Sequence, residues 1–393
     1  MRILLVNKFY YQRGGDCTAV FSTERLLKDK GHDVAIFSTK HTDNVHSDFE
    51  KYFPEEVSFS STGFSNKVSA VKRIFGSFEV ANKFKQLISD FKPDVVHMHN
   101  IHSHISPIVA KIAHENGIRV VWTLHDYKLI CPVYTCLRNN KTCEVCFKNK
   151  SGVMKYKCMK KSYMASMLAY LEGRHWNRKK LSTITDMFIS PSAFLKTKME
   201  EAGYLREQIE VLHNFMPVRV IPATEKDDYY CYTGRLSAEK GIDTLLEAAE
   251  KLPYRLKIIG GGPLLNAYRD RYRSDHIEFI GHTAPEKLYR IVSKARFLVI
   301  PSIWYENNPF SVIEALCLGT PVLGARIGGI PELIEEDKNG RLFTHGDITE
   351  LKENIELLFS ENISFDYAKI ASDAYNKFSP ETFYNKLIMF YDR

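Results

Sequence analysis

Short apolar runs rich in β-branched residues alternate along the chain with longer segments whose apolar residues recur at helical spacing. This alternation predicts parallel strands covered by helices, and so an α/β fold. In the first half we expect strands at 3–7, 33–38, 95–97, 119–124, 187–190 and 209–213. The second half repeats the plan with strands at 230–233, 255–259, 277–280, 297–300 and 321–324, separated by helices such as 243–251 and 285–295.

A chain of 393 residues is too long for one ordinary core and suits two domains, which implies a cleft between them. The polar stretch 217–228, with two prolines, is the predicted linker. We therefore predict two Rossmann-like domains that face each other across a cleft, at 1–215 and 216–378. Apolar residues at helical spacing predict a terminal helix in 379–393 that packs across the domains. Near 127–162, Cys, Lys and aromatic residues interrupt the strand pattern, which indicates an insertion.

The composition is that of an ordinary globular protein, with 44% hydrophobic and 26% charged residues. No segment reaches 18 consecutive apolar residues, and the opening apolar run is followed at once by Asn7 and Lys8. That run therefore predicts a buried first strand, neither a signal peptide nor a membrane span. In the cytoplasm that this implies, the eight cysteines favour a metal site or plain core over disulfides.

The net charge of +7 is concentrated in one region. Residues 138–180 contain twelve Lys or Arg but only Glu144 and Glu172 as acids, a local excess of +10 that leaves about −3 for the remainder. Such a stretch is usually a solvated face, although it could also attract anionic lipid head groups or nucleic acid. Its aromatic and basic run over 154–170 could form an amphipathic surface.

Open parallel sheets bind ligands beyond the carboxyl ends of their strands. After the first strand come Gly14 and Gly15, where the backbone could approach a phosphate or sugar or simply turn. His125 follows a later strand of the same half, where a buried structural role is the alternative.

Two cations follow the first strand of the second half. Arg235 and Lys240, next to Gly234, could grip a diphosphate, Arg through paired hydrogen bonds and Lys as a point charge. Cations at a helix start are otherwise disfavoured by the helix dipole. The loop with Gly261 and Gly262 follows the next strand and could pack on a nucleotide or form a tight turn.

Two carboxylates, Glu306 and Glu314, frame the segment after the strand at 297–300. Glu306 is expected in a loop, and Pro309 suits the first turn of a helix that contains Glu314. Both carboxylates could face one cleft, although this spacing alone is common on exposed helices.

Taken in order, these pieces resemble the GT-B glycosyltransferase family 4, which has a Glu-x7-Glu element at this place. The resemblance also includes Gly328-Gly329-Ile330-Pro331-Glu332 and spans nearly the whole chain. It implies a GT-B fold and a retaining enzyme that transfers a hexose from a UDP- or GDP-sugar to a lipid-linked or polysaccharide acceptor. The expected setting is surface polysaccharide biosynthesis, such as lipopolysaccharide or capsule.

The resemblance also implies roles for individual residues. Catalysis would involve His125, Glu306, Arg235 and Lys240. The donor would contact Gly14, Gly15, Gly234, Arg235, Lys240, Gly261, Gly262, Glu306, Asn307, Asn308, Phe310 and Glu314, with Glu314 accepting hydrogen bonds from the ribose. Family members need no catalytic metal, and a front-face route, in which the leaving phosphate helps to deprotonate the acceptor, is favoured.

Five cysteines crowd the insertion. Cys143 and Cys146 have the spacing that lets two thiolates hold one ion, and Cys131 and Cys158 could complete a tetrahedral structural zinc site, with Cys136 to spare. This arrangement resembles a Cys-Pro and Cys-x2-Cys element that a subset of the family carries after the same strand, and the resemblance supports a structural role. Unligated thiols, another metal or redox chemistry remain alternatives.

A rival reading of the insertion is a zinc-stapled basic module that binds nucleic acid. It explains the Cys and Lys residues but leaves the strand-end cations and the glutamate pair without a role, so we expect no nucleic-acid partner. An NAD-dependent oxidoreductase is disfavoured because no Gly-x-Gly-x-x-Gly turn follows the first strand. The expected partners are a nucleotide-sugar donor, a lipid-linked or glycan acceptor, and the inner face of the plasma membrane as a peripheral contact.

Overall fold

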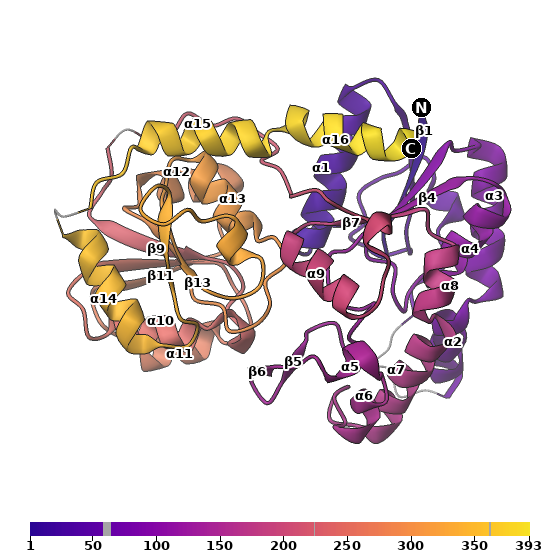
Figure 1. The fold of residues 1–393 in the computed structure, drawn as a ribbon, viewed down its shortest axis with the longest axis horizontal. Helices are drawn as coiled ribbons and strands as arrows, with labels where there is room; N and C mark the ends of the chain where they lie inside the picture. The colour runs from indigo at the N-terminus through magenta and orange to yellow at the C-terminus, as the bar shows by residue number, and fades with distance from the viewer. Residues whose placement is uncertain (58–63, 224, 361–362) are drawn as a thin grey trace. The chain divides into compact units, whose positions relative to one another are not determined.

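The computed structural model describes residues 1–57, 64–223, 225–360 and 363–393, with side chains from residue 70 onward after the first gap. The chain forms two compact units. The first comprises Met1–Cys136, Cys143–Leu212 and Tyr384–Arg393, and the second comprises Leu137–Thr142 and His213–Phe383. Figure 1 follows the chain through both units by colour.

The first unit contains a six-stranded parallel sheet in the order β2-β1-β3-β4-β7-β8. In its register, Leu4 pairs with Ala35 on one side and with Val96 on the other. The strands are nearly continuous apolar runs, as expected for a parallel sheet that is covered on both faces. Their bounds are β1 (Arg2–Val6), β2 (Asp33–Phe37), β3 (Val95–Met98), β4 (Arg119–Thr123), β7 (Met187–Ser190) and β8 (Ile209–Val211).

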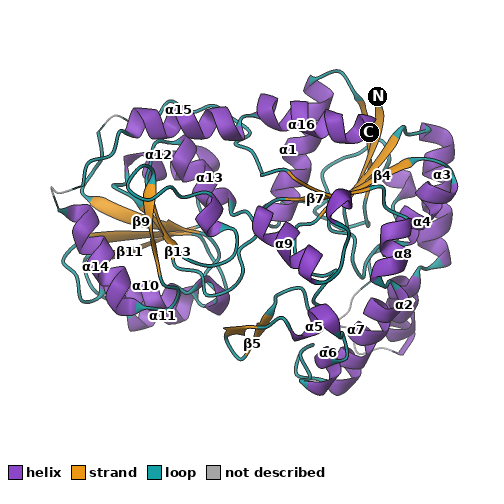
Figure 2. Cartoon of the chain, in the orientation of Figure 1, coloured by secondary structure: helices purple, strands orange, loops and turns teal. Residues whose placement is uncertain are grey.

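Helices connect and cover these strands (Figure 2). Helix α3 shows why they form, because Ser77 caps its first turn by accepting a hydrogen bond from the N–H of Val80 at 3.3 Å. Its buried residues Val80, Phe84, Leu87 and Phe91 recur at helical spacing. The helices of this unit outside the insertion are α1 (Gly15–Asp29), α2 (Phe64–Phe75), α3 (Phe78–Phe91), α4 (Ile108–Glu115), α8 (Arg178–Thr183) and α9 (Ala193–Glu201).

The second unit has its own six-stranded parallel sheet in the order β11-β10-β9-β12-β13-β14, the order of a Rossmann sheet. The strands are β9 (Tyr229–Thr233), β10 (Arg255–Ile259), β11 (Ile277–Gly281), β12 (Leu298–Ile300), β13 (Val322–Ala325) and β14 (Gly340–Phe343). The helices are α10 (Ile242–Ala249), α11 (Leu265–Arg271), α12 (Pro285–Lys294), α13 (Phe310–Cys317), α14 (Ile348–Phe359) and α15 (Tyr367–Phe378). The prediction of two Rossmann-like α/β domains is therefore confirmed.

The insertion is a small substructure of the chain between β4 and β7. It contains β5 (Leu137–Arg138), β6 (Lys141–Thr142), α5 (Val145–Lys148), α6 (Gly152–Lys155) and α7 (Tyr163–His175). Cys146, Val153 and Ala169 form a small buried cluster beneath α5, α6 and α7. An ion pair between Lys128 and Glu172, with 2.8 Å between nitrogen and oxygen, ties α7 to the chain just after β4. Both side chains are more than nine-tenths buried, so this small core is firmly attached.

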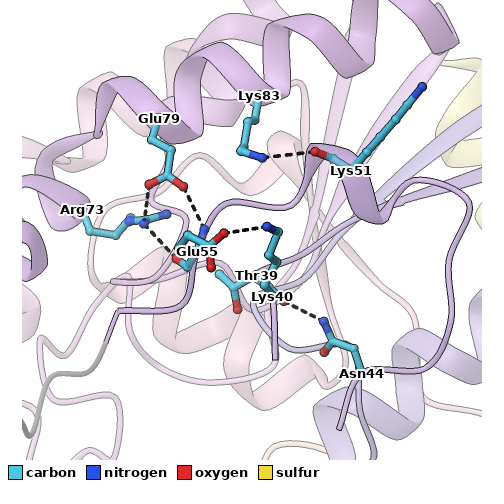
Figure 3. A network of polar contacts seen from close by, with 8 residues as sticks. All are labelled: Thr39, Lys40, Asn44, Lys51, Glu55, Arg73, Glu79 and Lys83. Atoms are coloured by element: carbon cyan, nitrogen blue, oxygen red, sulfur yellow. Dashed lines mark hydrogen bonds and ion pairs between the residues drawn. The ribbon is translucent and has the colours of Figure 1, made fainter. Parts of the chain in front are cut away.

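Polar contacts hold the segment after β2 against α3 (Figure 3). The buried guanidinium of Arg73 donates to the backbone carbonyl of Glu55 at 2.9 Å and to the carboxylate of Glu79 at 3.0 Å. The same carboxylate accepts the backbone N–H of Glu55 at 2.8 Å. Lys40 completes the network with an ion pair of 2.6 Å to the Glu55 side chain. The chain leaving β2 is therefore fixed at two points along this connection.

The chain ends in helix α16 (Pro380–Asp392), whose residues from Tyr384 onward belong to the first unit. The guanidinium of Arg119 donates two hydrogen bonds to the carbonyl of Phe390, at 3.0 and 2.9 Å. The hydroxyl of Tyr391 lies 2.6 Å from Nδ1 of His97 on β3. Across the described ranges, no helix has both the length and the apolar character needed to cross a bilayer.

Candidate functional site

The second unit places opposite charges where its strand order reverses, between β9 and β12. In open parallel sheets, ligands bind at such a point, beyond the carboxyl ends of the strands. Lys240 follows β9 and Glu306 follows β12, and the Lys240 ammonium lies 2.7 Å from Oε1 of Glu306. The structure thus brings together two of the predicted catalytic residues.

The carboxylate of Glu306 is buried and held in one orientation. Its Oε1 accepts hydrogen bonds from Lys240, from the Ser302 hydroxyl at 2.6 Å and from the Trp304 indole N–H at 2.9 Å. Burial alone would raise the pKa of Glu306, but the Lys240 charge and these hydrogen bonds hold it below its ordinary value. The Lys240 ammonium also lies 5.2 Å from the centre of the Trp304 ring. Since an ammonium has three N–H donors, Lys240 can keep Glu306 and still bind an anion.

Close backbone contacts fix the two loops that hold these charges. A Cβ on Gly328, whose φ is +61°, would lie 2.3 Å from the carbonyl oxygen of Glu306. The same oxygen accepts the N–H of Gly329 at 2.7 Å. A Cβ on Gly241, whose φ is +69°, would lie 1.9 Å from the carbonyl oxygen of Pro301. Only glycine fits at these two positions, so backbone packing sets where the loops after β9, β12 and β13 lie.

The loops after β9 and β10 also pack together. The N–H of Leu236 donates to the carbonyl of Gly261 at 2.8 Å, and a Cβ on Gly262 would lie 2.5 Å from the carbonyl of Leu236. Gly234 directly follows β9, and Arg235 after it is exposed. The predicted glycines therefore form one compact edge from which the Arg235 side chain extends into solvent.

Asn307, Asn308 and Phe310 lie along the same loop but have different surroundings. The side chain of Asn308 is buried, and its Oδ1 accepts the backbone N–H of Asn214 at 2.7 Å. The backbone carbonyl of Asn308 accepts the amide of Asn214 at 2.8 Å, and its own amide lies 3.2 Å from Nδ1 of His213. Asn307 remains in the loop, and Phe310 is the first residue of α13. Asn308 therefore anchors the first residues of the second unit.

Glu314 lies inside α13, with its carboxyl group buried beside the Tyr289 hydroxyl of α12. Burial raises the pKa of Glu314 to about 7, although the hydrogen bond from Tyr289 opposes the shift. The carboxyl group is therefore close to half protonated at neutral pH. Hydrogen-bond donors from a ligand would favour its ionised form.

The first unit also places polar side chains where its strand order reverses, between β1 and β3. The Lys8 ammonium donates to Oδ1 of Asn100 at 2.9 Å, and the Asn100 amide donates to Oδ2 of Asp16 at 3.0 Å. Burial lowers the pKa of Lys8, while the carboxylates of Asp126 and Asp16 counteract the shift. This partly buried chain of contacts joins β1, α1 and β3 at the edge of the sheet where parallel sheets commonly bind ligands.

His125 lies two residues after the end of β4, in the same region. Its Nε2 lies 2.9 Å from Nδ1 of His99, and the two rings stack with centroids 5.2 Å apart. Burial lowers the pKa of His125 to about 4 against the opposing pull of Asp16, and burial holds the pKa of His99 well below its usual value. Both rings are therefore neutral at neutral pH. One ring nitrogen must donate the shared proton and the other must accept it.

The predicted glycine pair lies at the amino terminus of α1. Gly14 is in an extended conformation and Gly15 begins the helix, and both are exposed. Asp16 in the same turn connects them to the buried contacts of Lys8 and Asn100. An exposed helix amino terminus favours an anion, because its N–H groups and dipole both point outward.

The five cysteines of the insertion lie in one region of the chain as free thiols. The thiol of Cys131 is hydrogen-bonded to that of Cys136, the cysteine expected to be spare. Cys146 is buried, with Cys143 and Cys158 among the groups that influence its charge. In the described part of the chain, no three His, Cys, Asp or Glu side chains are arranged to hold a metal ion. Zinc on Cys131, Cys143, Cys146 and Cys158 therefore stays a prediction, which metal analysis can test.

Sequence reasoning missed several residues of these two sites. Ser302 and Trp304 precede Glu306 by only a few positions, yet a serine or tryptophan in a loop gives no signal until its partner is known. Lys8 and Asn100 are 92 positions apart and meet only because β1 and β3 pair. Their one available signal was their position shortly after a predicted strand, the criterion that did select His125.

Two family profiles match the chain. Residues 14–219 match "Glycosyltransferase Family 4", and residues 218–377 match "Glycosyl transferases group 1". Together they cover nearly the whole chain, and the first alone covers just over half of it. They meet at residues 218–219, close to the start of the second unit.

Curated relatives are similar over different lengths. An uncharacterised 42.6 kDa protein from the cps region of Klebsiella pneumoniae is 27% identical over 352 residues, which is 85% of this chain and 87% of that protein. The putative colanic acid biosynthesis glycosyltransferase WcaL of Escherichia coli is 27% identical over 213 residues, 49% of this chain and 52% of WcaL. The similarity to WcaL thus covers only about half of each protein.

Solved structures resemble the chain over almost its full length. The lipopolysaccharide outer core galactosyltransferase WaaB in its apo form has a TM-score of 0.66 at 16% identity, with 99% of each chain covered. Anabaena HepE in complex with UDP and glucose has a TM-score of 0.70, again at 16% identity and 99% coverage of both chains. At such identities the resemblance establishes the fold alone.

Proposed function

This chain belongs to glycosyltransferase family 4, with a group 1 glycosyltransferase domain, and from that membership we propose that it transfers a hexose from a nucleotide sugar to a lipid-linked or polysaccharide acceptor. The observation that carries the proposal is the Lys240–Glu306 pair at the strand reversal of the second unit. A buried carboxylate beside a partly exposed ammonium suits a ligand that combines sugar hydroxyls with a diphosphate.

Named relatives support a role in surface polysaccharide assembly. WcaL is named for colanic acid biosynthesis, WaaB for the lipopolysaccharide outer core, and the Klebsiella relative for a cps region. The HepE structure contains UDP and glucose, which makes a UDP-hexose the first donor to test here. We propose that the reaction takes place on the cytoplasmic side of the membrane.

Each polar group of the second unit has a role in this proposal. Lys240 and the exposed Arg235 bind the diphosphate and stabilise the charge that develops on it as the nucleoside diphosphate leaves. Glu306 accepts hydrogen bonds from the transferred sugar, in the orientation that its partners impose. The ribose hydroxyls donate to Glu314, whose ionised form they favour.

The transfer that we propose keeps the anomeric configuration. The bond between the anomeric carbon and the phosphate oxygen breaks, and the acceptor oxygen bonds to the same face of that carbon. The acceptor proton passes to the leaving phosphate, so that no catalytic metal and no protein nucleophile is required. His125, neutral at the pH of the cell, would hydrogen-bond to the transferred sugar without adding positive charge.

Thermal unfolding against a panel of nucleotides and nucleotide sugars tests the proposal first, because a ligand of the native state raises the unfolding midpoint. We expect one nucleoside diphosphate and its sugars to raise it. In Arg235→Ala and Lys240→Ala, the lost phosphate contact should cost roughly 1.5 to 3 kcal/mol, about a ten- to hundredfold loss of donor affinity or turnover.

Two controls make this test decisive. Lys338→Ala removes a lysine of the same unit whose side chain is 77% exposed, and it should leave donor affinity unchanged. Lys240→Ala leaves the buried carboxylate of Glu306 without its cation, which should destabilise the fold, so the thermal stability of this variant is measured separately. Arg235 is exposed, and its substitution leaves no buried charge unpaired. Absence of a shift with every nucleotide sugar, or unchanged kinetics in both variants, would refute the proposed donor site.

A further inference from the structure

The insertion exposes a cluster of lysines from the last residue of α6 to the loop before α7. We call Lys155, Lys157, Lys160 and Lys161 the lysine cap; all four are exposed. Three of them, at 157, 160 and 161, have φ between +49° and +54°, a left-handed conformation that lysine disfavours relative to glycine or asparagine. Backbone preference therefore does not explain why lysine stands at these positions.

Among the described residues, no ion pair involves a lysine of the cap. The only acidic residues in 138–180 are Glu144 and Glu172. Glu172 is buried and paired with Lys128, and Glu144 forms an ion pair with Lys198 at 2.8 Å. The amino terminus of α7, which begins two residues after the cap, adds the positive end of a helix dipole. The surface is therefore suited to a partner with many negative charges.

Helix α7 continues this surface with apolar side chains. Met164, Met167, Leu168 and Leu171 recur at the spacing of one helix face, and we call them the apolar stripe. Met164 is 66% exposed and Leu171 is 42% exposed, while the two residues between them are half-buried. Tyr163, beside the stripe, is 53% exposed. Exposed lysines beside exposed long-chain apolar side chains and a tyrosine suit the interface of a membrane, which is charged at the head groups and apolar below them.

The surface stands on a firm base. The buried cluster of Cys146, Val153 and Ala169 packs α5, α6 and α7 together, and Figure 1 shows these helices as one group within the first unit. The ion pair between Lys128 and Glu172 attaches α7 to the strand end that holds His125. A partner on this surface would thus be held at a fixed place relative to the polar site of the first unit.

From this juxtaposition we propose that the lysine cap and the apolar stripe dock the protein on a bilayer of anionic lipids. The lysines attract the phosphate-bearing head groups, and the apolar stripe enters the boundary of the acyl chains. Nucleic acid would use the lysines but not a Met and Leu stripe, which offers neither stacking surfaces nor hydrogen bonds. The inference goes beyond the proposed sugar transfer, and its test needs neither donor nor acceptor, so the two can fail separately.

Co-sedimentation of the full chain with vesicles tests the proposal. We expect binding to phosphatidylcholine vesicles that contain phosphatidylglycerol, little binding to phosphatidylcholine alone, and release at high salt. Reversal of the lysine cap (Lys155→Glu, Lys157→Glu, Lys160→Glu and Lys161→Glu) should weaken binding by about tenfold or more. A matched variant that reverses four exposed lysines of the second unit, at 287, 338, 369 and 377, changes the net charge equally and should still bind.

The apolar stripe is tested separately. Met164→Ser with Leu171→Ser should weaken binding to anionic vesicles, whereas Met389→Ser with Leu205→Ser, at residues that are 56% and 53% exposed elsewhere, should not. If charge reversal of the cap lowers the thermal unfolding midpoint, the neutral Lys→Gln set replaces it. Equal binding to both kinds of vesicle, equal losses in the matched variants, or binding to duplex DNA but not to vesicles would overturn the proposal.

Discussion

At the scale of single residues, the most informative feature is a carboxyl group with a shifted pKa inside the second unit. The residue Glu314 is partly exposed but its carboxyl group is desolvated, and the groups that face it are the Tyr289 hydroxyl from α12 and the Cys317 thiol on its own helix. Neither carries a charge at neutral pH. Its titration is therefore governed by burial, and any ligand that donates hydrogen bonds to it changes that titration.

Donor binding should depend on pH through this residue. Because the pKa of Glu314 is raised to about 7, the free protein holds a proton there at lower pH, and a ribose that needs the carboxylate must displace it. We expect donor affinity to rise as the pH rises through 7, with binding about tenfold tighter at pH 8 than at pH 6. Titration calorimetry across this range measures the effect.

Two variants separate this explanation from others. Glu314→Gln should bind the donor with nearly the same affinity at every pH. Tyr289→Phe removes the hydrogen bond that stabilises the carboxylate, so the rise in affinity should move to higher pH. A pH dependence that persists in Glu314→Gln would assign the proton to another group.

The histidine pair offers a second test at this scale. Nε2 of His99 is buried and has no hydrogen-bond partner among the described residues, and an unmet nitrogen lone pair is tolerated better than an unmet N–H. His99 then carries its proton on Nδ1 and donates it to Nε2 of His125. His99 is thus a positioning residue that sets which nitrogen of His125 can donate.

We expect His99→Phe to lower kcat by roughly tenfold while the KM for the donor changes little. His99→Asn places an amide donor near the position of Nδ1 and should restore most of the activity. Steady-state kinetics and thermal unfolding of both variants provide the comparison. Equal losses in the two variants would indicate a role in packing alone.

At the scale of elements, the strands were predictable because their signal is local. Every strand expected from apolar runs is present, with ends within two residues of the prediction. In the two parallel sheets, the strand that was missed is β14, which begins with Gly340 and Arg341 and has no β-branched residue, so it forms through pairing with β13 and not through propensity. Its identity as a strand depends on a neighbour in space, which a single sequence does not reveal.

The insertion is the element whose chemistry was least predictable. Spacing predicts a zinc site on four cysteines, and in the structure the thiol of Cys131 is hydrogen-bonded to that of the fifth, Cys136. A spacing rule predicts which residues can reach one ion but not which thiols pack together when the chain folds. A zinc site and a set of free thiols can be distinguished by the effect of single cysteine substitutions on zinc content.

A zinc ion held by the predicted ligands should be retained in Cys136→Ser and lost in Cys146→Ser. Metal content measured by mass spectrometry on the purified variants, with thermal unfolding before and after chelation, distinguishes the two outcomes. Zinc lost equally from both variants would point to a different ligand set. A wild-type protein without zinc would leave the cysteines as packing residues.

At the scale of the whole molecule, both units place polar side chains where the strand order reverses, and sequence reasoning predicted this placement. Glu306 and Lys240 could be selected because each follows a strand. The hydrogen bond that ties His97 to Tyr391 joins residues 294 positions apart and could not be selected in this way. Polar partners that are distant in sequence can be predicted only after the strand order is known, because their residue types alone do not indicate which residues will meet.

The terminal helix α16 has a consequence for how the protein is made. Leu387, Phe390 and Tyr391 complete the buried side of the first unit, and Phe390 accepts the hydrogen bonds of Arg119. Residues 1–212 leave the ribosome long before these positions are synthesised. The first unit therefore cannot complete its fold until after the second unit has been synthesised. The emerging chain must therefore wait with that surface uncovered until α16 has been synthesised, a period in which chaperones and proteases can reach it.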